Sequence, residues 1–255
     1  MSDYEYKGLM AEYWDILRGD TSQWSDRFFY LELIKQYGQP VLDVGCGTGR
    51  LLLDYLAQGI DIDGVDNSPE MLEICQRKAR KLGLLPVLHE QNMEVLALPR
   101  LYRTILIPSS SLQLIIEPEM AKMVVQQLAT HLAPGGALVA PFMSIHNPSD
   151  PLESQWEKQV TRPEDGAVIR RVAWSRYDPV SECEETRDLY QVLVDGEVMA
   201  EEQHQRNPAT RNYTQRQAMA LYAAGGLQNV RMYKEFTLEP AQPEDWIFTL
   251  VGENQ

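Results

Sequence analysis

Residues able to bind an anionic ligand are concentrated in a glycine-rich turn between two predicted elements. The run Val41–Val44 is mostly apolar, as expected for a buried parallel strand. Gly45, Gly47 and Gly49 follow at alternate positions, and apolar residues at helical spacing begin at Leu51. Glycines let the backbone adopt positive φ, and free N–H groups at a helix start favour an anion. The order strand, glycine turn, helix therefore indicates an anion site; the alternative is a tight turn without a ligand.

A second strand, at residues 61–66, ends in an acid suited to a ribose diol. Asp66 lies about 20 residues beyond the glycine turn, the distance at which an acid meets a ribose in nucleotide folds. Ser68 and Pro69 then provide the cap and first position of another helix. Asp61 and Asp63 are rival acids. We favour Asp66, because ligands bind beyond the carboxyl ends of parallel strands.

The glycine spacing narrows the class of nucleotide. It reads G-x-G-x-G, one residue shorter than the dinucleotide fingerprint, and the sequence has no P-loop motif. At this point the chain resembles the class I S-adenosylmethionine-dependent methyltransferases of the small-molecule type. The resemblance covers roughly residues 10–142 and rests on three segments: Leu42-Asp-Val-Gly-Cys-Gly-Thr-Gly-Arg50, Gly64-Val-Asp-Asn-Ser-Pro-Glu-Met-Leu72 and Leu132-Ala-Pro-Gly-Gly136.

The resemblance implies S-adenosylmethionine as cofactor and S-adenosylhomocysteine as product. The family often closes an N-terminal segment over the cofactor, which places an aromatic residue near the methionyl end. Where the family has an acid for the adenine amino group, this chain has an amide, which can also accept a hydrogen bond. The residues expected to contact the cofactor are Tyr13, Asp43, Gly45, Cys46, Gly47, Gly49, Asp66, Asn67, Met71, Asn92, Met93, Pro108 and Ser109.

The remaining pattern alternates helices and strands. It predicts an α/β fold with a doubly wound, mostly parallel seven-stranded sheet, the Rossmann-like methyltransferase fold, and an antiparallel β insertion after strand 5. The expected parts are N-terminal lid helices with a cofactor-binding core (1–143), an insertion covering the substrate site (144–212) and the end of the core sheet (213–255). The lid helix is expected at residues 4–17, where the alternative is a helix that only caps the domain.

The insertion is expected to be a small antiparallel sheet. Residues 168–177 and 186–194 alternate as strands, and Asp195-Gly196 is a strong two-residue hairpin signal. We expect deletion of this segment to leave donor binding largely intact and to abolish methyl transfer. The alternative is a dimer interface, because exposed aromatic residues also mark interfaces.

Composition limits the partners. The chain has 255 residues and a net charge of −14, which argues against nonspecific nucleic-acid binding. Three cysteines without metal or redox spacing and four scattered histidines predict a reduced cytoplasmic protein without a metal site. No apolar run is long enough to span a bilayer, and no signal peptide is apparent. We expect a small-molecule acceptor, no nucleic acid, no membrane, and a monomer or homodimer.

The function indicated is methyl transfer to a nitrogen or oxygen of a small molecule, mainly by positioning of the reactants. A general base is needed only when the acceptor carries a proton. The candidate bases, each more often structural, are His146, Tyr177, His204 and Tyr213. The alternative from another class is a catalytically silent S-adenosylmethionine-binding or scaffold protein on the same fold.

Overall fold

The structure is a computed structural model that describes residues 6–255, so Tyr4, where the predicted lid helix begins, lies outside the described residues. The helices are α1 (Gly8–Arg18), α2 (Ser25–Tyr37), α3 (Arg50–Ala57), α4 (Pro69–Leu82), α5 (Pro118–Thr130) and α6 (Gln215–Ala224), with 3-10 turns η1 (Met93–Val95) and η2 (Ser111–Leu114). The strands are β1 (Val41–Val44), β2 (Ile62–Asp66), β3 (Val87–Glu90), β4 (Tyr102–Leu106), β5 (Leu132–Met143), β6 (Glu153–Thr161), β7 (Val168–Asp178), β8 (Cys183–Val194), β9 (Glu197–Arg211), β10 (Gln228–Lys234) and β11 (Ile247–Glu253).

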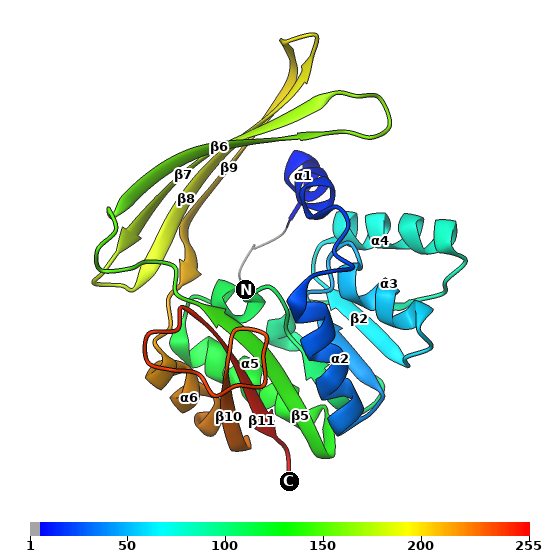
Figure 1. The fold of residues 1–255 in the computed structure, drawn as a ribbon, viewed down its shortest axis with the longest axis vertical. Coiled ribbons are helices and arrows are strands. Elements are labelled where there is room, and N and C mark those ends of the chain that lie inside the picture. The colour runs from blue at the N-terminus through cyan, green and yellow to red at the C-terminus, as the bar shows by residue number, and fades with distance from the viewer. Residues whose placement is uncertain (1–5) are drawn as a thin grey trace.

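Seven strands form the main sheet, in the order β10-β11-β5-β4-β1-β2-β3. The neighbours from β5 to β3 pair in parallel, and β11 runs antiparallel to β5 and to β10. Helices pack on both faces of this sheet (Figure 1), which explains why β1 is buried along its whole length. The predicted doubly wound, mostly parallel seven-stranded fold is confirmed.

The register of β1 and β2 positions the glycine turn. Val44 pairs with Val65, so Gly45, which follows β1, and Asp66, the last residue of β2, lie at the same edge of the sheet. Helix α4 begins directly after this point, and the Ser68 hydroxyl accepts the N–H of Met71 as its cap, 3.1 Å away.

The insertion is a four-stranded antiparallel sheet, in the order β6-β7-β8-β9, that stands above the core in Figure 1. The predicted hairpin is present: Asp195 and Gly196 both have positive φ, and Val194 pairs with Glu197. Strand β6 was not expected from the sequence. Apart from Val160, its side chains are exposed, so no alternating apolar pattern marks it.

Helix α1 lies between the two sheets and shares a hydrophobic cluster with the insertion (Figure 1). Met10 and Tyr13 pack there against Ile169, Tyr190 and Val192. Because α1 packs on the insertion, deletion of the insertion is expected to affect the position of α1 as well.

Polar contacts fix α1 to both parts of the molecule. The N–H of Gly8 donates to the Glu70 carboxylate of α4, and the N–H of Leu9 donates to the Glu202 carboxylate of β9 at 2.7 Å. Carboxylates at a helix N-terminus interact favourably with its dipole. Two ion pairs add to these contacts: Asp15–Lys78 at 2.7 Å and Glu12–Arg162 at 2.6 Å.

Candidate functional site

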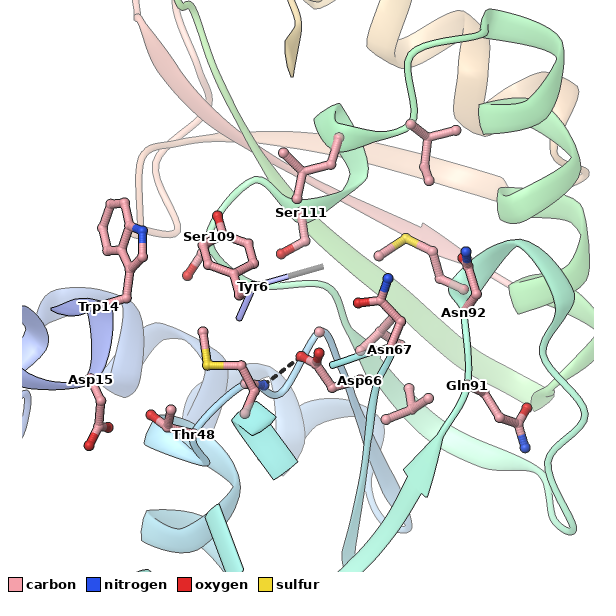
Figure 2. A pocket seen from close by; sticks show the side chains of 18 of the residues that line it. Tyr6, Trp14, Asp15, Thr48, Asp66, Asn67, Gln91, Asn92, Ser109 and Ser111 are labelled. Carbon is pink, nitrogen blue, oxygen red and sulfur yellow. Dashed lines mark hydrogen bonds between the residues drawn. The ribbon is translucent and has the colours of Figure 1, made fainter. Parts of the chain in front are cut away.

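A pocket opens at the carboxyl ends of β1 and β2, beneath α1 (Figure 2). Asp66 and Asn67 lie at its centre, Trp14 and Asp15 at one end, and Gln91 and Asn92 at the other. The pocket is therefore elongated, with α1 at one end and the loop after β3 at the other. The predicted residues that line it are Gly45, Gly47, Asp66, Asn67, Met71, Asn92, Met93 and Ser109.

The glycine turn and Asp66 are joined by a hydrogen bond. The Gly47 N–H donates to one carboxylate oxygen of Asp66 at 2.8 Å, and the Ser68 N–H donates to the other at 2.9 Å. Burial raises the pKa of Asp66, while these N–H groups oppose the rise. Gly47 has φ +54°, and a Cβ placed there would meet no atom within 4 Å. The turn therefore presents backbone, without side chain, to the open pocket.

The rival acids are held elsewhere. Arg100 forms a two-pronged contact with Asp61 at 2.8 Å and a second contact with Asp63 at 2.6 Å. The Tyr102 hydroxyl also donates to Asp63 at 2.7 Å. Both acids lie at the start of β2, away from the edge where the pocket opens. Of these three acids, Asp66 is thus the one that lines the pocket.

Several residues expected at the cofactor lie behind the turn instead. A Cβ at Gly49 would lie 2.6 Å from the Cys75 sulfur, so Gly49 is needed for close packing of helix on sheet. Cys46 is buried, and its sulfur packs against Gly64. Asp43 is 2% exposed and one of its oxygens has no partner among the described residues. The carbonyl of Pro108 accepts a hydrogen bond from the Ser111 hydroxyl at 2.7 Å.

On α1, Trp14 lines the pocket and the predicted Tyr13 does not. Tyr13 is fully buried and meets Tyr190 edge-on at 5.4 Å between ring centroids, so it packs on the insertion. One residue further along the helix, Trp14 lines the pocket, and its indole N–H is buried without a partner among the described residues. An indole nitrogen only donates, so it suits an oxygen of a ligand.

Of the described residues that line this pocket, Arg18 alone is basic. Its guanidinium lies 5.8 Å from the Trp14 ring centroid and 3.4 Å from the Ser109 hydroxyl. Burial lowers the pKa of Arg18, which still leaves it a cation at neutral pH. The sequence signal that could have identified Trp14 and Arg18 was their i,i+4 spacing. This spacing places both side chains on one helix face, beside the apolar stripe.

At the opposite end of the pocket, the side-chain oxygen of Asn92 already accepts one hydrogen bond. This oxygen, which the resemblance assigned to the adenine amino group, accepts the Glu94 N–H at 3.0 Å and caps η1. A second lone pair on that oxygen stays available. Met93 lines the pocket and also packs against the main core.

A second pocket lies under the antiparallel sheet and shares wall residues with the first: Tyr6, Trp14, Ser109 and Leu114. Ser109 and Ser110 stand between β4 and η2 with φ of 57° and 58°, a left-handed conformation that is uncommon outside glycine. Such strain is often found at functional sites. The Gln113 side chain donates to the carbonyls of Met143 and Arg211 at 3.0 and 2.9 Å, so it holds the base of the insertion.

None of the four predicted bases lines either pocket in the described part of the chain. His146 and Tyr177 stack on each other, with ring centroids 4.5 Å apart. His204 is held by Glu202 at 2.6 Å. Tyr213 packs edge-on against Phe142 in the main core. Each is engaged by a neighbour away from the pockets.

Residues 6–255 contain no cluster of three or more metal-ligating side chains. The same residues include no helix with the length and apolar character needed to cross a bilayer.

Comparisons with known proteins give one consistent result. Residues 41–136 match a family model described as a methyltransferase domain. A methyltransferase of Geobacillus sp. strain WCH70 is 36% identical over 87 residues, which are 32% of this chain and 35% of the relative, about a third of its length.

Two solved structures have the same fold. A S-adenosylmethionine-dependent methyltransferase from Clostridium acetobutylicum has a TM-score of 0.75 at 21% identity, over 95% of this chain and 96% of that one. The sugar N-methyltransferase KedS8 from Streptoalloteichus sp. has a TM-score of 0.74 at 20% identity, over 100% and 96% of the two chains.

Proposed function

We propose that this chain is an enzyme that methylates a small-molecule acceptor. Its residues 41–136 match a methyltransferase domain, and its fold is that of the class I S-adenosylmethionine-dependent methyltransferases. S-Adenosylmethionine is the methyl donor, S-adenosylhomocysteine is the product, and the acceptor atom is a nitrogen or an oxygen. The observation that carries this proposal is the joining of the glycine turn and Asp66 in the wall of one pocket that adjoins a second.

The residues of the first pocket fit the donor. Asp66 is a carboxylate for the ribose hydroxyls, and the open backbone at Gly47 allows close approach of the methionyl part. Arg18 is a cation for the methionyl carboxylate, and the unpartnered Trp14 N–H is a donor for an oxygen. Asn92 stands at the end of the pocket that suits the adenine, and Met93, the next residue in the chain, also lines the pocket.

When bound, the donor supplies a methyl group on a positively charged sulfur, which is reactive towards a lone pair in line with it. The chain's own task is then to hold an acceptor in that line and to exclude water. Tyr6, Trp14 and Ser109 belong to both pockets, so they stand where the donor and acceptor sites meet. Helix α1 covers this junction.

Donor binding tests the proposal through Asp66. Hydrogen bonds to a charged acceptor contribute about 1.5–3 kcal/mol each, so Asp66→Ala should weaken S-adenosylhomocysteine binding at least about tenfold. Calorimetry measures this affinity. The matched control is Asp61→Ala, which removes the same group from the Arg100 contact outside the pocket. Because burial raises the pKa of Asp66, wild-type affinity should also fall as the pH falls through that raised value.

Equal effects of the two substitutions on affinity would contradict this placement of the donor. Release of S-adenosylhomocysteine during incubation with acceptors then separates an enzyme from a silent binding protein. A chain that binds donor but never turns it over would favour the scaffold alternative.

A further inference from the structure

The second pocket contains a carboxylate that has no cationic partner. Glu184, on β8, lines this pocket together with Asp188, which lies on the same face of the strand. Asp188 is paired with Arg171 at 2.8 Å. Among the described residues, no Lys, Arg or His nitrogen lies within ion-pair distance of Glu184. Of the two acids that line this pocket, Glu184 is therefore the one that forms no ion pair with a described residue.

Two arginines, Arg171 and Arg206, also line this pocket. Burial raises the pKa of Asp188, and Arg171 and Arg206 oppose that rise. Burial also raises the pKa of Glu184, opposed by a hydrogen bond from the Ser175 hydroxyl; the nearby charge of Asp188 adds to the rise and that of Arg171 opposes it. A half-buried carboxylate with a single hydroxyl partner is costly to keep ionised unless a cation joins it.

The surroundings of Glu184 suit a cation with apolar substituents. The pocket walls include the ring of Tyr6 and the side chains of Leu114, Met143 and Ile145. The Trp14 ring also lines the pocket, but the guanidiniums of Arg18 and Arg171 already lie against it. Aromatic faces attract cations, and apolar walls accept the carbon skeleton that carries the charge. The shared wall at Trp14 and Ser109 brings such a ligand next to the first pocket.

We propose that Glu184 is the acceptor-binding carboxylate and that the acceptor is an amine, which Glu184 recognises as its ammonium ion. This inference rests on the proposed function, and it selects nitrogen over oxygen as the methylated atom.

In this proposal Glu184 is also the general base that removes a proton from the ammonium ion. An alkyl amine is protonated at neutral pH and has no free lone pair. One N–H bond must break, leaving the electron pair on nitrogen and passing the proton to an acceptor. A carboxylate whose pKa is raised by burial is a better proton acceptor than an exposed one. Transfer of that proton gives a neutral amine and a neutral carboxylic acid, and total charge is conserved.

The test compares amines with alcohols of the same skeleton: cyclohexylamine with cyclohexanol, and glucosamine with glucose. Each is titrated into the S-adenosylhomocysteine complex by calorimetry, and each is incubated with donor carrying a deuterated methyl group and read by mass spectrometry. We expect amines to bind at least about tenfold more tightly than their alcohols and the label to appear on nitrogen. Amine affinity should fall as the pH falls through the raised pKa of Glu184.

Three variants complete the test. Glu184→Gln should lose at least about tenfold in amine affinity and its pH dependence, with unchanged affinity for S-adenosylhomocysteine. Glu184→Asp, which keeps the charge, should lose less. Glu197→Gln makes the same change of charge at the exposed β8–β9 hairpin and should change nothing.

Alcohols that bind or react as well as amines, a panel in which no amine binds, or amine affinity that survives Glu184→Gln would each overturn the inference. Failure of the wild-type chain to bind S-adenosylhomocysteine would instead contradict the proposed function.

Discussion

The carboxyl group of Asp43 lies directly behind the glycine turn and carries a charge that little around it offsets. Burial raises its pKa to about 7, with Arg50 opposing the rise and Asp66 adding to it. Arg50 is itself engaged by Asp26 at 2.5 Å. The ionised form of Asp43 is therefore destabilised in the folded chain relative to the unfolded one.

This predicts a pH-dependent stability that Asp43→Asn removes. A raised folded-state pKa means that the folded chain binds the extra proton between about pH 4 and 7, so stability falls as the pH rises through that window. Relative to Asp43→Asn, the wild-type free energy of unfolding should fall by about 4 kcal/mol over it. Urea denaturation at several pH values measures this, with the exposed Asp150→Asn as control. A constant difference between wild type and Asp43→Asn across the window would contradict it.

At the residue scale, the sequence identified the part of the site that depends on chain order. Gly47 and Asp66 follow consecutive parallel strands, and the ends of such strands meet at one edge, so their proximity was predictable. The choice of Tyr13 over Trp14 was not. A step of one residue turns a helix by about 100°, and the sequence alone did not say which side of α1 the insertion occupies.

At the scale of elements, α1 and three strands of the insertion meet around the guanidinium of Arg171. The Arg171 guanidinium lies 4.6 Å from the ring centroid of Trp156 and 5.2 Å from that of Trp14, and it also pairs with Asp188. The rings of Tyr13 and Tyr190 lie within 6.0 and 5.7 Å. Residues of α1, β6 and β8 thus meet around one cation from β7.

We predict that Arg171→Met loosens α1. It leaves the Asp188 charge buried without its partner, which costs about 3 kcal/mol or more in similar cases. Amide hydrogen exchange over residues 8–18 should speed up, and urea denaturation should show the loss of stability. The double variant Arg171→Met with Asp188→Asn should lose less than the sum of the two single changes. Unchanged exchange in α1 would show that the guanidinium does not hold the helix.

The elements themselves were predicted unevenly for a physical reason. Helix α4 begins where it was predicted to begin, because Ser68 and Pro69 mark its start. Strand β6 was missed, because exposed polar side chains such as Gln155 and Glu157 give no alternating pattern. Edge strands of an open antiparallel sheet are specified by pairing with a neighbour more than by their own composition.

At the scale of the whole molecule, the donor pocket depends on the insertion through α1. Deletion of residues 144–212 removes Ile169, Tyr190 and Val192, against which α1 packs, and removes Glu202 from its N-terminus. We now expect this deletion to weaken S-adenosylhomocysteine binding, contrary to the expectation from sequence. If α1 is docked in fewer than a tenth of the molecules, the affinity falls more than about tenfold.

Calorimetry on a deletion variant that circular dichroism shows to be folded measures this loss. A variant that lacks residues 1–19 is the matched comparison and should lose a similar amount. Full donor affinity in the chain without the insertion would show that α1 docks on the core alone, through Glu70 and Lys78.

The position of α1 between the two sheets also limits how this protein can be recombined with its relatives. An exchange confined to residues 144–212 would set a foreign sheet against the native Met10, Tyr13 and Trp14, and would break the contacts of Glu12 and Leu9 across the new junction. The N-terminal helix and the insertion are distant in sequence, but they must be exchanged together to keep their contacts. Chimaeras that transplant residues 6–19 together with 144–212 should retain activity more often than those that move either segment alone.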